Sequence, residues 1–431
     1  MVVLVVAVPA LASCTGADGA ASPSPTSRPG RDLPNVSAAE IADAIDFVEA
    51  TFDAELVAPP RVLIGTRDQV AAANRSLDDD PEPLEPSPLL LDRPGVDRVL
   101  GLQLPTRSVL DAGAWYDGER NEIVLVADET STSDQLSPEL RSTLVHEMTH
   151  ALFPPQGVAA TTDRNMAEWI RSEGLAGAAQ GEWDRVAAVD APDPAVGSPT
   201  TPDDVSLIGL SYALGDLRFT RELFGVRGDV DRVHDAVESA AVFFDPSLPL
   251  GWSAADDLSE PVVPEDTTDV QRDRIGMSVL AEVVSRGHGA DLGAVLGWRG
   301  DITAAYRRAD GELCVASRVR TVDDAAADRL GHALEVALAG ASVVIDGDDV
   351  LWSTCGERTD ATEATDFGRL ASQAHLTNLF IENGQGGQPV DSTTAWCASG
   401  RLHDRVDWKV VYRGGPDVES EIAALVGDCR R

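Results

Sequence analysis

Basic residues are scarce in this chain, and their scarcity limits what it can bind. Asp and Glu number 72 against 34 Lys and Arg, which gives a formal net charge of −38. A field of that sign repels nucleic-acid phosphates and anionic membrane surfaces, so we expect no nucleic-acid partner. Aromatic residues are also few, at 5%, yet 43% of the residues are apolar and are enough for a packed core. A chain of 431 residues has the length of roughly two or three domains.

The chain has only five cysteines, and none of them stands in the CxxC spacing of a cysteine-bound zinc site. Cys14 lies near the N-terminus, and four others lie in the C-terminal third, at Cys314, Cys355, Cys397 and Cys429. An even set of four is typical of disulfides in an exported protein. Four cysteines allow three pairings. The short separations favour Cys314–Cys355 and Cys397–Cys429.

Long apolar runs are absent after Cys14, and the run before it is short. Residues 1–12 (MVVLVVAVPALA) are almost wholly apolar but too few to span a bilayer. The letters LASC that end at Cys14 resemble the lipobox of bacterial lipoproteins, although no Lys or Arg precedes the apolar run. The resemblance implies a signal peptide over 1–13, a lipid on Cys14 and a flexible tether over 14–36. It also implies export to the outer face of the bacterial cytoplasmic membrane, with the lipid as the membrane contact.

Local patterns predict a helix, a strand and a loop after the tether. Residues 37–55 are amphipathic, and Ser37 with Glu40 three positions later indicates a capping box at a helix start. Residues 61–65 (RVLIG) are typical of a short strand. Prolines and acidic residues predict an irregular surface loop at 75–97. Its acidic run is an alternative calcium site, which the prolines disfavour.

A mostly helical region follows a predicted turn and strand. The turn is at 116–118 (YDG), and the β-rich run is at 121–127 (NEIVLVA). Ser137 followed by Pro138 is typical of a helix start, and helical patterns continue to about residue 310.

The pattern changes from about residue 311 onward. Residues 311–360 predict strand, helix, strand and strand, and 361–431 predict a second small α+β module. We therefore expect an α+β fold: a mostly helical domain with a small sheet over 37–310, followed by two small disulfide-closed α+β modules. Trp298 is expected to pack between the helical domain and the first module.

The letters HEMTH form an HExxH motif from His146, Glu147 and His150. On a helix, residues four apart lie on one face, so both imidazoles can reach one metal ion. Glu147 is placed to contact a metal-bound water without being a ligand itself. The motif therefore indicates a catalytic zinc centre. The alternative is a buried helix that carries these histidines by chance.

A catalytic zinc needs a third protein ligand and an open position for water. The next predicted helix (MAEWIRSEGLA) offers Glu168 and Glu173. Glu173 shares a face with apolar residues, where a carboxylate is costly unless it is paired or binds a metal. Glu168 falls on the polar side with Arg171 and Ser172 and is expected to be solvated. We expect Glu173 to be the third ligand, with a buried ion pair to an Arg as the alternative.

HEMTH followed by WIRSEGLA resembles the gluzincin metallopeptidases of the peptidase MA-like clan, in which an EG-containing helix such as WLxEGxA supplies the third zinc ligand. The upstream YDGERNEIVLVA and the downstream LSYALGDLRFTRELFG are also similar to segments of that group. The resemblance implies a zincin-like domain in which His146, His150 and Glu173 bind zinc and Glu147 is the general base. It further implies that Tyr212 donates to the oxyanion.

The implied function is a lipid-anchored zinc peptidase that hydrolyses peptide or protein substrates with a zinc-bound water activated by Glu147. No exopeptidase anchoring motif such as GAMEN is present, which favours an endopeptidase, and WIRSEG has one more residue between Trp and Glu than the commonest form. Tyr116 is a rival oxyanion donor.

Two alternatives stay open: an inactive zincin-fold surface lipoprotein that binds a partner, and a structural or adhesive lipoprotein whose C-terminal modules are the working part. The remaining histidines lie in no metal-ligand pattern and are expected at the surface or at helix caps: His234, His288, His332, His375 and His403.

Overall fold

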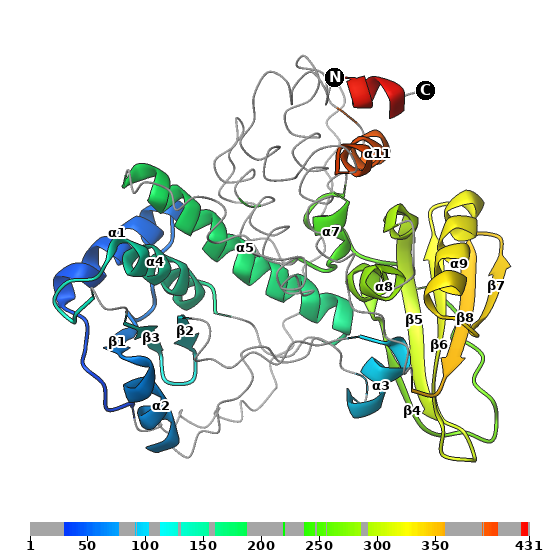
Figure 1. Cartoon of the computed structure of the whole chain (residues 1–431), viewed down its shortest axis with the longest axis horizontal. Helices are drawn as coiled ribbons and strands as arrows, with labels where there is room; N and C mark the ends of the chain where they lie inside the picture. Colours follow the sequence, from blue (N-terminus) through cyan, green and yellow to red (C-terminus); the bar gives the residue numbers. More distant parts are fainter. Residues whose placement is uncertain are drawn as a thin grey trace, which may run out of the picture.

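The structure is a computed structural model that describes residues 30–76, 91, 93–102, 113–127, 131–154, 160–187, 219, 237–245, 248–255, 257–285, 292–357, 390, 392–403 and 424–429. Over these residues the architecture is α+β, as the sequence predicts. Two sheets lie at opposite ends, and helices fill the space between them (Figure 1).

The smaller sheet has the order β1-β3-β2 and consists of β1 (Arg61–Gly65), β2 (Ala114–Asp117) and β3 (Glu122–Val126). The larger sheet has the order β4-β5-β6-β8-β7 and consists of β4 (Thr268–Asp273), β5 (Trp298–Arg307), β6 (Leu313–Thr321), β7 (Ser342–Asp346) and β8 (Asp349–Cys355). The helices are α1 (Ala38–Phe52), α2 (Arg67–Ser76), α3 (Arg93–Leu100), α4 (Pro138–Leu152), α5 (Thr162–Val186), α7 (Ala241–Phe244), α8 (Gly276–Ser285), the 3-10 helix η4 (Leu292–Gly297), α9 (Asp324–Ala337) and α11 (Ser392–His403).

The smaller sheet is buried on both faces, which explains its nearly continuous apolar strands. Successive side chains of a strand point to opposite faces. Leu63 and Val124 therefore pack with α2, whereas Ile64, Ile123 and Leu125 belong to the main core that includes α4. The predicted strand at 61–65 is confirmed as β1, which pairs in parallel with β3, and β2 pairs with β3 antiparallel.

Two local predictions in this region need correction. Residues 116 and 117, predicted in a turn, are the last residues of β2, and the turn follows at 118–121. The capping box at the start of α1 does not form, because Ser37 makes no side-chain cap hydrogen bond. The Glu40 carboxylate instead accepts from Nε and Nη2 of Arg141, at 2.7 and 2.8 Å, and so ties α1 to α4.

The larger sheet crosses residue 310, where a domain boundary was expected. β5 and β6 pair along their length, from Trp298↔Thr321 to Arg307↔Leu313. Residues 311–357 do contain strand, helix, strand and strand in the predicted order. Strands of a hairpin share their backbone hydrogen bonds, so this segment forms one sheet with β4 and β5 and is not a separate module. The expected division at residue 310 is therefore wrong.

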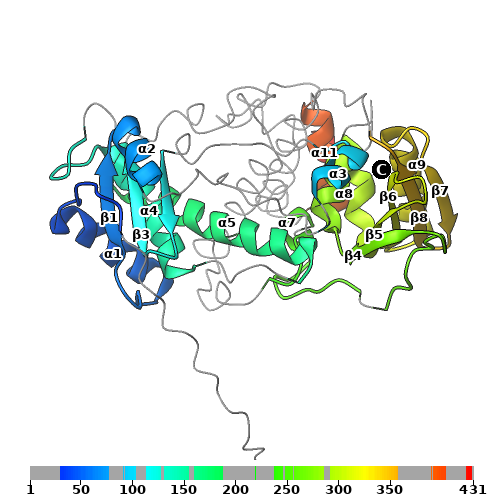
Figure 2. The same cartoon turned by 90° about the horizontal axis from the view of Figure 1, so that it is seen from below.

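Helix α5 connects the two ends of the molecule (Figure 2). Its 25 residues make it roughly 37 Å long at about 1.5 Å per residue. At its start, the backbone N–H of Thr162 donates to Asp273 Oδ1 at 2.9 Å, beside the junction of β4 and α8. Near its end, Trp183 packs edge-on against Phe47 of α1, with ring centroids 5.1 Å apart. The helix is thus held at both ends.

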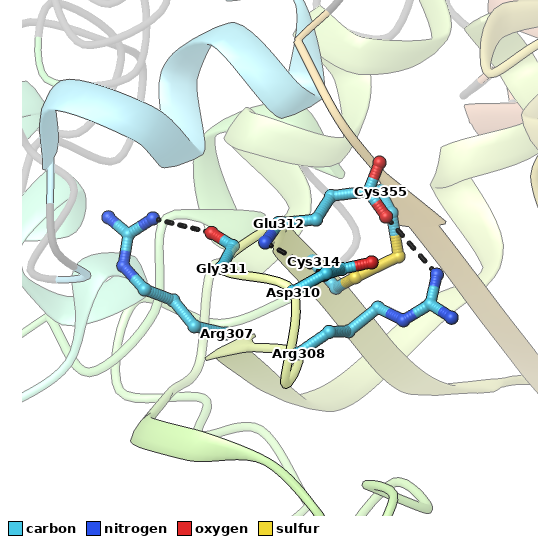
Figure 3. The surroundings of a disulfide bond; sticks show 7 residues. All are labelled: Arg307, Arg308, Asp310, Gly311, Glu312, Cys314 and Cys355. Atoms are coloured by element: carbon cyan, nitrogen blue, oxygen red, sulfur yellow. Dashed lines mark hydrogen bonds and ion pairs between the residues drawn. A yellow bond between two sulfur atoms is a disulfide. The ribbon is translucent and has the colours of Figure 1, made fainter.

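Both favoured disulfides are confirmed. Cys314 and Cys355 are direct cross-strand partners on β6 and β8, and Cys397 pairs with Cys429. Figure 3 shows the first disulfide beside the β5–β6 turn, where Arg308 and Glu312 form an ion pair at 3.1 Å.

Several predictions fall outside the described residues. These are the signal peptide, the lipidation site Cys14, most of the tether, most of the acidic loop and of 361–431, and the residues Tyr212, His234, His288 and His375. Helix α11, which was not predicted, is one of the described parts of the C-terminal segment. In the part of the chain that the structure describes, no helix combines the length and apolar character needed to cross a membrane.

Candidate metal centre

Helix α4 carries the HExxH motif and begins as predicted. The Ser137 hydroxyl accepts from the N–H of Leu140 at 3.2 Å, and Pro138 is the first helical residue. Leu144 and Met148 are fully buried in the main core. Their burial fixes the rotation of the helix about its axis and leaves the motif histidines on the side that faces α5.

Glu173 brings a carboxylate from α5 to both imidazoles. Its Oε2 lies 3.3 Å from His146 Nε2 and 3.5 Å from His150 Nε2. These three residues form a group whose ligand atoms all lie within 4.8 Å of one another. The two imidazoles are therefore partners of this carboxylate, as a metal ligand requires, whereas the alternative prediction paired it with an Arg.

The spacing of these atoms fits zinc. Tetrahedral zinc with bonds of about 2.0–2.1 Å holds its ligand atoms about 3.3–3.4 Å apart. The observed separations of 3.3 and 3.5 Å agree with that edge length. Two imidazole nitrogens and one carboxylate oxygen are also the donor set of catalytic zinc sites that keep an open position.

The outer nitrogens of both imidazoles have hydrogen-bond partners. His146 Nδ1 lies 3.1 Å from Gln180 Oε1, and His150 Nδ1 lies 2.9 Å from Ser172 Oγ. Gln180 Nε2 in turn donates to Ser142 Oγ at 3.1 Å. Partners on the outer nitrogen orient a metal-binding imidazole, so these contacts turn both Nε2 atoms toward Glu173.

Sequence reasoning missed these supporting residues. Ser172 was predicted on the polar side of α5, yet only 9% of it is exposed and it contacts His150. Gln180 lies two helical turns after Glu173, and Ser142 lies one turn before His146. Helical spacing from the ligands was the signal that could have found Ser142 and Gln180.

Glu147 lies beside these three residues and is only 7% exposed. Its carboxylate accepts a hydrogen bond from the backbone N–H of Tyr116 on β2. Hydrogen-bonded and non-hydrogen-bonded residue pairs alternate along an antiparallel pair of strands. Val126 of β3 donates to Gly113, so Tyr116, three residues further on, belongs to a non-hydrogen-bonded pair and its N–H points away from β3. The Tyr116 hydroxyl donates to Asn121 Oδ1 at 3.1 Å.

Burial and neighbouring charges shift the pKa values of Glu147, His150 and Glu173 in opposite directions. Burial raises the pKa of Glu147, and the nearby charges of His150 and His146 only partly offset it. Burial lowers the pKa of His150, but the Glu173 and Glu147 carboxylates outweigh it and raise the value to about 9. Burial raises the pKa of Glu173, but both imidazoles bring it well below its usual range.

Two predictions away from the centre are also tested. Trp298 is fully buried at the start of β5 and packs against Trp252, with ring centroids 6.1 Å apart. Its burial is as expected, but it does not lie between two modules, because β5 and β6 belong to one sheet. His332 on α9 has 80% of its side chain exposed, as expected for a surface histidine.

A cavity of about 350 Å³ lies away from the metal centre, between α3 and the β5–β6 turn. None of the residues that line it belongs to α4 or α5. Two charged residues that line it, Arg98 and Glu357, form an ion pair with each other at 2.8 Å. This cavity is therefore separate from the group formed by His146, His150 and Glu173.

Comparisons of the chain with protein-family models, with curated proteins and with solved structures found no match. The interpretation of the centre rests on its residues and their geometry.

Proposed function

We propose that this chain is a zinc-dependent endopeptidase of the gluzincin type. The observation that carries the proposal is the meeting of two imidazole Nε2 atoms and the Glu173 Oε2 at separations that tetrahedral zinc requires, with a buried carboxylate beside them. We further propose that a lipid on Cys14 holds the protein at the outer face of the bacterial cytoplasmic membrane.

His146, His150 and Glu173 would hold the ion and leave one position open. Zinc bound there would supply a Lewis acid that lowers the pKa of water and polarises a peptide carbonyl. Glu147 takes a proton from the attacking water and passes it to the departing amine nitrogen. Its raised pKa suits both transfers, and the N–H of Tyr116 orients its carboxylate. Tyr212 is the proposed oxyanion donor, by resemblance.

The position of β2 supports a peptide as the substrate. β2 is an edge strand of the smaller sheet, and its outward backbone groups lie beside Glu147. An extended peptide can add to such an edge through main-chain hydrogen bonds. The net charge of −38 would favour the approach of cationic peptides.

The Glu147→Gln variant tests the proposal. Residues 15–431, loaded with zinc, should cleave an unstructured fluorogenic protein. The variant should bind zinc normally, but its cleavage rate should be about 10²–10⁴-fold lower. Glu139→Gln, at an exposed position on the same helix, is the matched control and should keep full activity.

Two outcomes would contradict the proposal. A zinc-loaded Glu147→Gln variant with wild-type activity would remove Glu147 as the base. A folded, zinc-loaded wild type that cleaves none of a broad peptide library would favour the alternative, an inactive zincin-fold lipoprotein that binds a partner.

The lipid anchor is tested separately. A full-length chain expressed in a bacterium with a labelled fatty acid should incorporate the label and sediment with membranes. Cys14→Ala should do neither, and equal labelling of the two chains would contradict the anchor.

A further inference from the structure

We infer that Glu312, Cys314 and Cys355 form a second metal site when the disulfide between the two cysteines is reduced, and that this site takes a soft divalent cation such as zinc. The chain passes through the dithiol state before its disulfide forms, so the site exists at that stage. The inference uses none of the residues of the proposed zinc centre and does not rest on the proposed function.

The pairing of β6 with β8 brings the three side chains together. Cys314 and Cys355 are direct cross-strand partners. Glu312 lies two residues before Cys314, so both side chains point to the same face. The ligand atoms of the three residues all lie within 4.8 Å of one another. Tetrahedral zinc holds two thiolates and a carboxylate oxygen about 3.6–3.8 Å apart, so small side-chain movements are enough once the sulfur atoms separate.

The Glu312 carboxylate is directed at the backbone beside Cys355 (Figure 3). Its Oε2 pairs with Arg308 at 3.1 Å, and its Oε1 lies 3.1 Å from the point that a Cβ on Gly356 would occupy. Gly356 directly follows Cys355, and its missing side chain leaves this approach open. The ion pair with Arg308 is largely exposed and therefore weak, so it does not keep the carboxylate from a metal ion.

The surroundings of the pair leave a place for a further ligand. Cys314 is fully buried and Cys355 is exposed, so one sulfur is shielded and the other can be reached from solvent. The cavity of about 350 Å³ described above is lined by Glu312 and Gly356, among others. A water molecule in this cavity can complete the coordination of an ion held by three protein ligands.

The donor set selects the kind of ion. Thiolates favour zinc and similar soft cations over calcium or magnesium, which prefer oxygen ligands. Reduction by a dithiol adds two electrons and two protons to the sulfur atoms, and the dithiol leaves as its own disulfide. A zinc ion then replaces the two thiol protons, which pass to solvent. Loss of the ion and transfer of two electrons to an oxidising disulfide restore the Cys314–Cys355 bond.

Cobalt(II) is the probe, because a cobalt–thiolate bond gives a strong near-ultraviolet charge-transfer band that imidazole and carboxylate ligands do not give. Residues 15–431, which exclude Cys14, would be reduced with a phosphine, freed of it without oxygen, and titrated with cobalt. The reduced chain should show the band, and the oxidised chain should not. Because the band reports sulfur alone, its absence leaves the proposed zinc centre untouched, and a failure of that centre leaves the band untouched.

Two double variants assign the band to one pair of cysteines. Cys314→Ser with Cys355→Ser should abolish it, whereas Cys397→Ser with Cys429→Ser should keep it. The second pair is the matched control, because the part of the chain that the structure describes has no third ligand close enough to Cys397 and Cys429 to form such a group.

Glu312→Gln tests the carboxylate and leaves both thiols in place. It should weaken cobalt binding to the reduced chain by at least about 10–100-fold, which is the cost of losing even an outer support of a metal site. Glu357→Gln is the control and should bind cobalt as the wild type does. Glu357 lies two residues after Cys355 and is also exposed, but it pairs with Arg98 and is not part of the group.

Bound zinc should also slow the return of the disulfide, since the sulfur atoms are then occupied. Mass spectrometry of the reduced chain, treated with an oxidising low-molecular-weight disulfide, would follow both pairs. Zinc should delay the Cys314–Cys355 bond in the wild type, should delay it less in Glu312→Gln, and should leave the formation of Cys397–Cys429 unchanged.

Three results would overturn the inference. The first is a reduced wild type without the thiolate band. The second is a band that survives the loss of Cys314 and Cys355. The third is equal cobalt affinity in Glu312→Gln and Glu357→Gln, which would remove Glu312 from the site. If the reduced chain unfolds, cobalt should restore the larger sheet together with the band, and a chain that stays unfolded also contradicts the inference.

Discussion

Two neighbouring glutamates in the metal centre are driven to opposite ionisation behaviour by their surroundings. Glu173 lies between two imidazoles, which lower the pKa of its carboxyl and keep it ionised, as the proposed ligand role requires. Glu147 is desolvated and its pKa is raised, which suits a group that takes and returns a proton. Pairs of acids with pKa values driven apart are typical of sites that divide two roles between them.

Tyr116 provides a test at the scale of one hydroxyl group. Its hydroxyl already donates to Asn121, and its contact with Glu147 is through the backbone N–H, which a substitution retains. Tyr116→Phe should therefore lower kcat by less than about threefold, whereas removal of an oxyanion donor costs about 10²–10³-fold. Steady-state kinetics on the fluorogenic substrate would decide, and a loss of about 10²-fold would make Tyr116 the oxyanion donor in place of Tyr212.

The three residues proposed as ligands could be selected from the sequence, and the residues that contact them could not. HExxH spacing and the cost of a carboxylate on an apolar face point to His146, His150 and Glu173, which the structure brings together. Ser172 and Gln180, by contrast, have uncharged polar side chains of a kind that also occurs on solvated helix faces. Their residue type therefore does not show that they contact the imidazoles. Only the approach of α5 to α4 shows that they face the imidazoles.

At the scale of elements, buried carboxylates on strands accept hydrogen bonds from backbone N–H groups at the starts of two helices. Asp273, at the end of β4, accepts from the first N–H of α5, and Asp301 on β5 accepts from the N–H groups of Ile275 and Gly276 at the start of α8. Anions are favoured at helix N-termini, where N–H groups lack intrahelical partners. The Asp273 contact holds α5, the helix of Glu173, against the larger sheet, and the Asp301 contacts hold the start of α8 there.

Gly276 is the position at this junction that tolerates no side chain. Its φ is +80°, and an added Cβ would collide with the Asp163 side chain. Gly276→Ala should lower the free energy of unfolding by about 2–4 kcal/mol, the sum of left-handed backbone strain and overpacking. Gly340→Ala is the control: its φ is +86° with open space around it, so only strain of about 1–2 kcal/mol applies. Equal losses in urea denaturation of the two variants would contradict the close packing at Asp163.

The extent of the larger sheet could not be predicted from local patterns. β4 (TDVQRD) is mostly exposed and polar, which is not typical of a strand in a large sheet. β5 contains alanines and lies in a region whose sequence pattern predicts helices. Strand preference depends on cross-strand packing, and here β5 is a strand because it pairs with β6 along its length. By contrast, β6, α9, β7 and β8 were predictable, because each has a clear periodicity.

At the scale of the whole molecule, stability is linked to pH through buried acids between the two ends. Burial, together with the charge of an acidic neighbour, raises the pKa of Asp163 to about 7 and that of Asp301 to about 6. Hydrogen bonds to Ser239 and Ala240 and the charge of Arg274 lower the pKa of Asp163 only in part. The folded protein therefore holds protons that the unfolded chain releases.

The sign of the pH dependence follows from those raised values. Between about pH 4 and 7 the folded state binds more protons, so the contribution of Asp163 to stability falls as pH rises through this window. Asp163→Asn should stabilise the metal-free protein at pH 8, by about 1–4 kcal/mol, and should have little effect near pH 4.5. Denaturation of both proteins across this range is the measurement. A variant equally destabilised at both pH values would contradict the raised pKa.

Zinc stoichiometry tests the central claim most directly. Residues 15–431 would be purified without chelator, reconstituted with zinc, and analysed for metal per chain beside Glu173→Ala and Glu168→Ala, which lie on the same helix. The account predicts about one zinc per chain in the wild type and in Glu168→Ala, and little or none in Glu173→Ala. No zinc in the wild type after reconstitution, or undiminished zinc in Glu173→Ala, would contradict it.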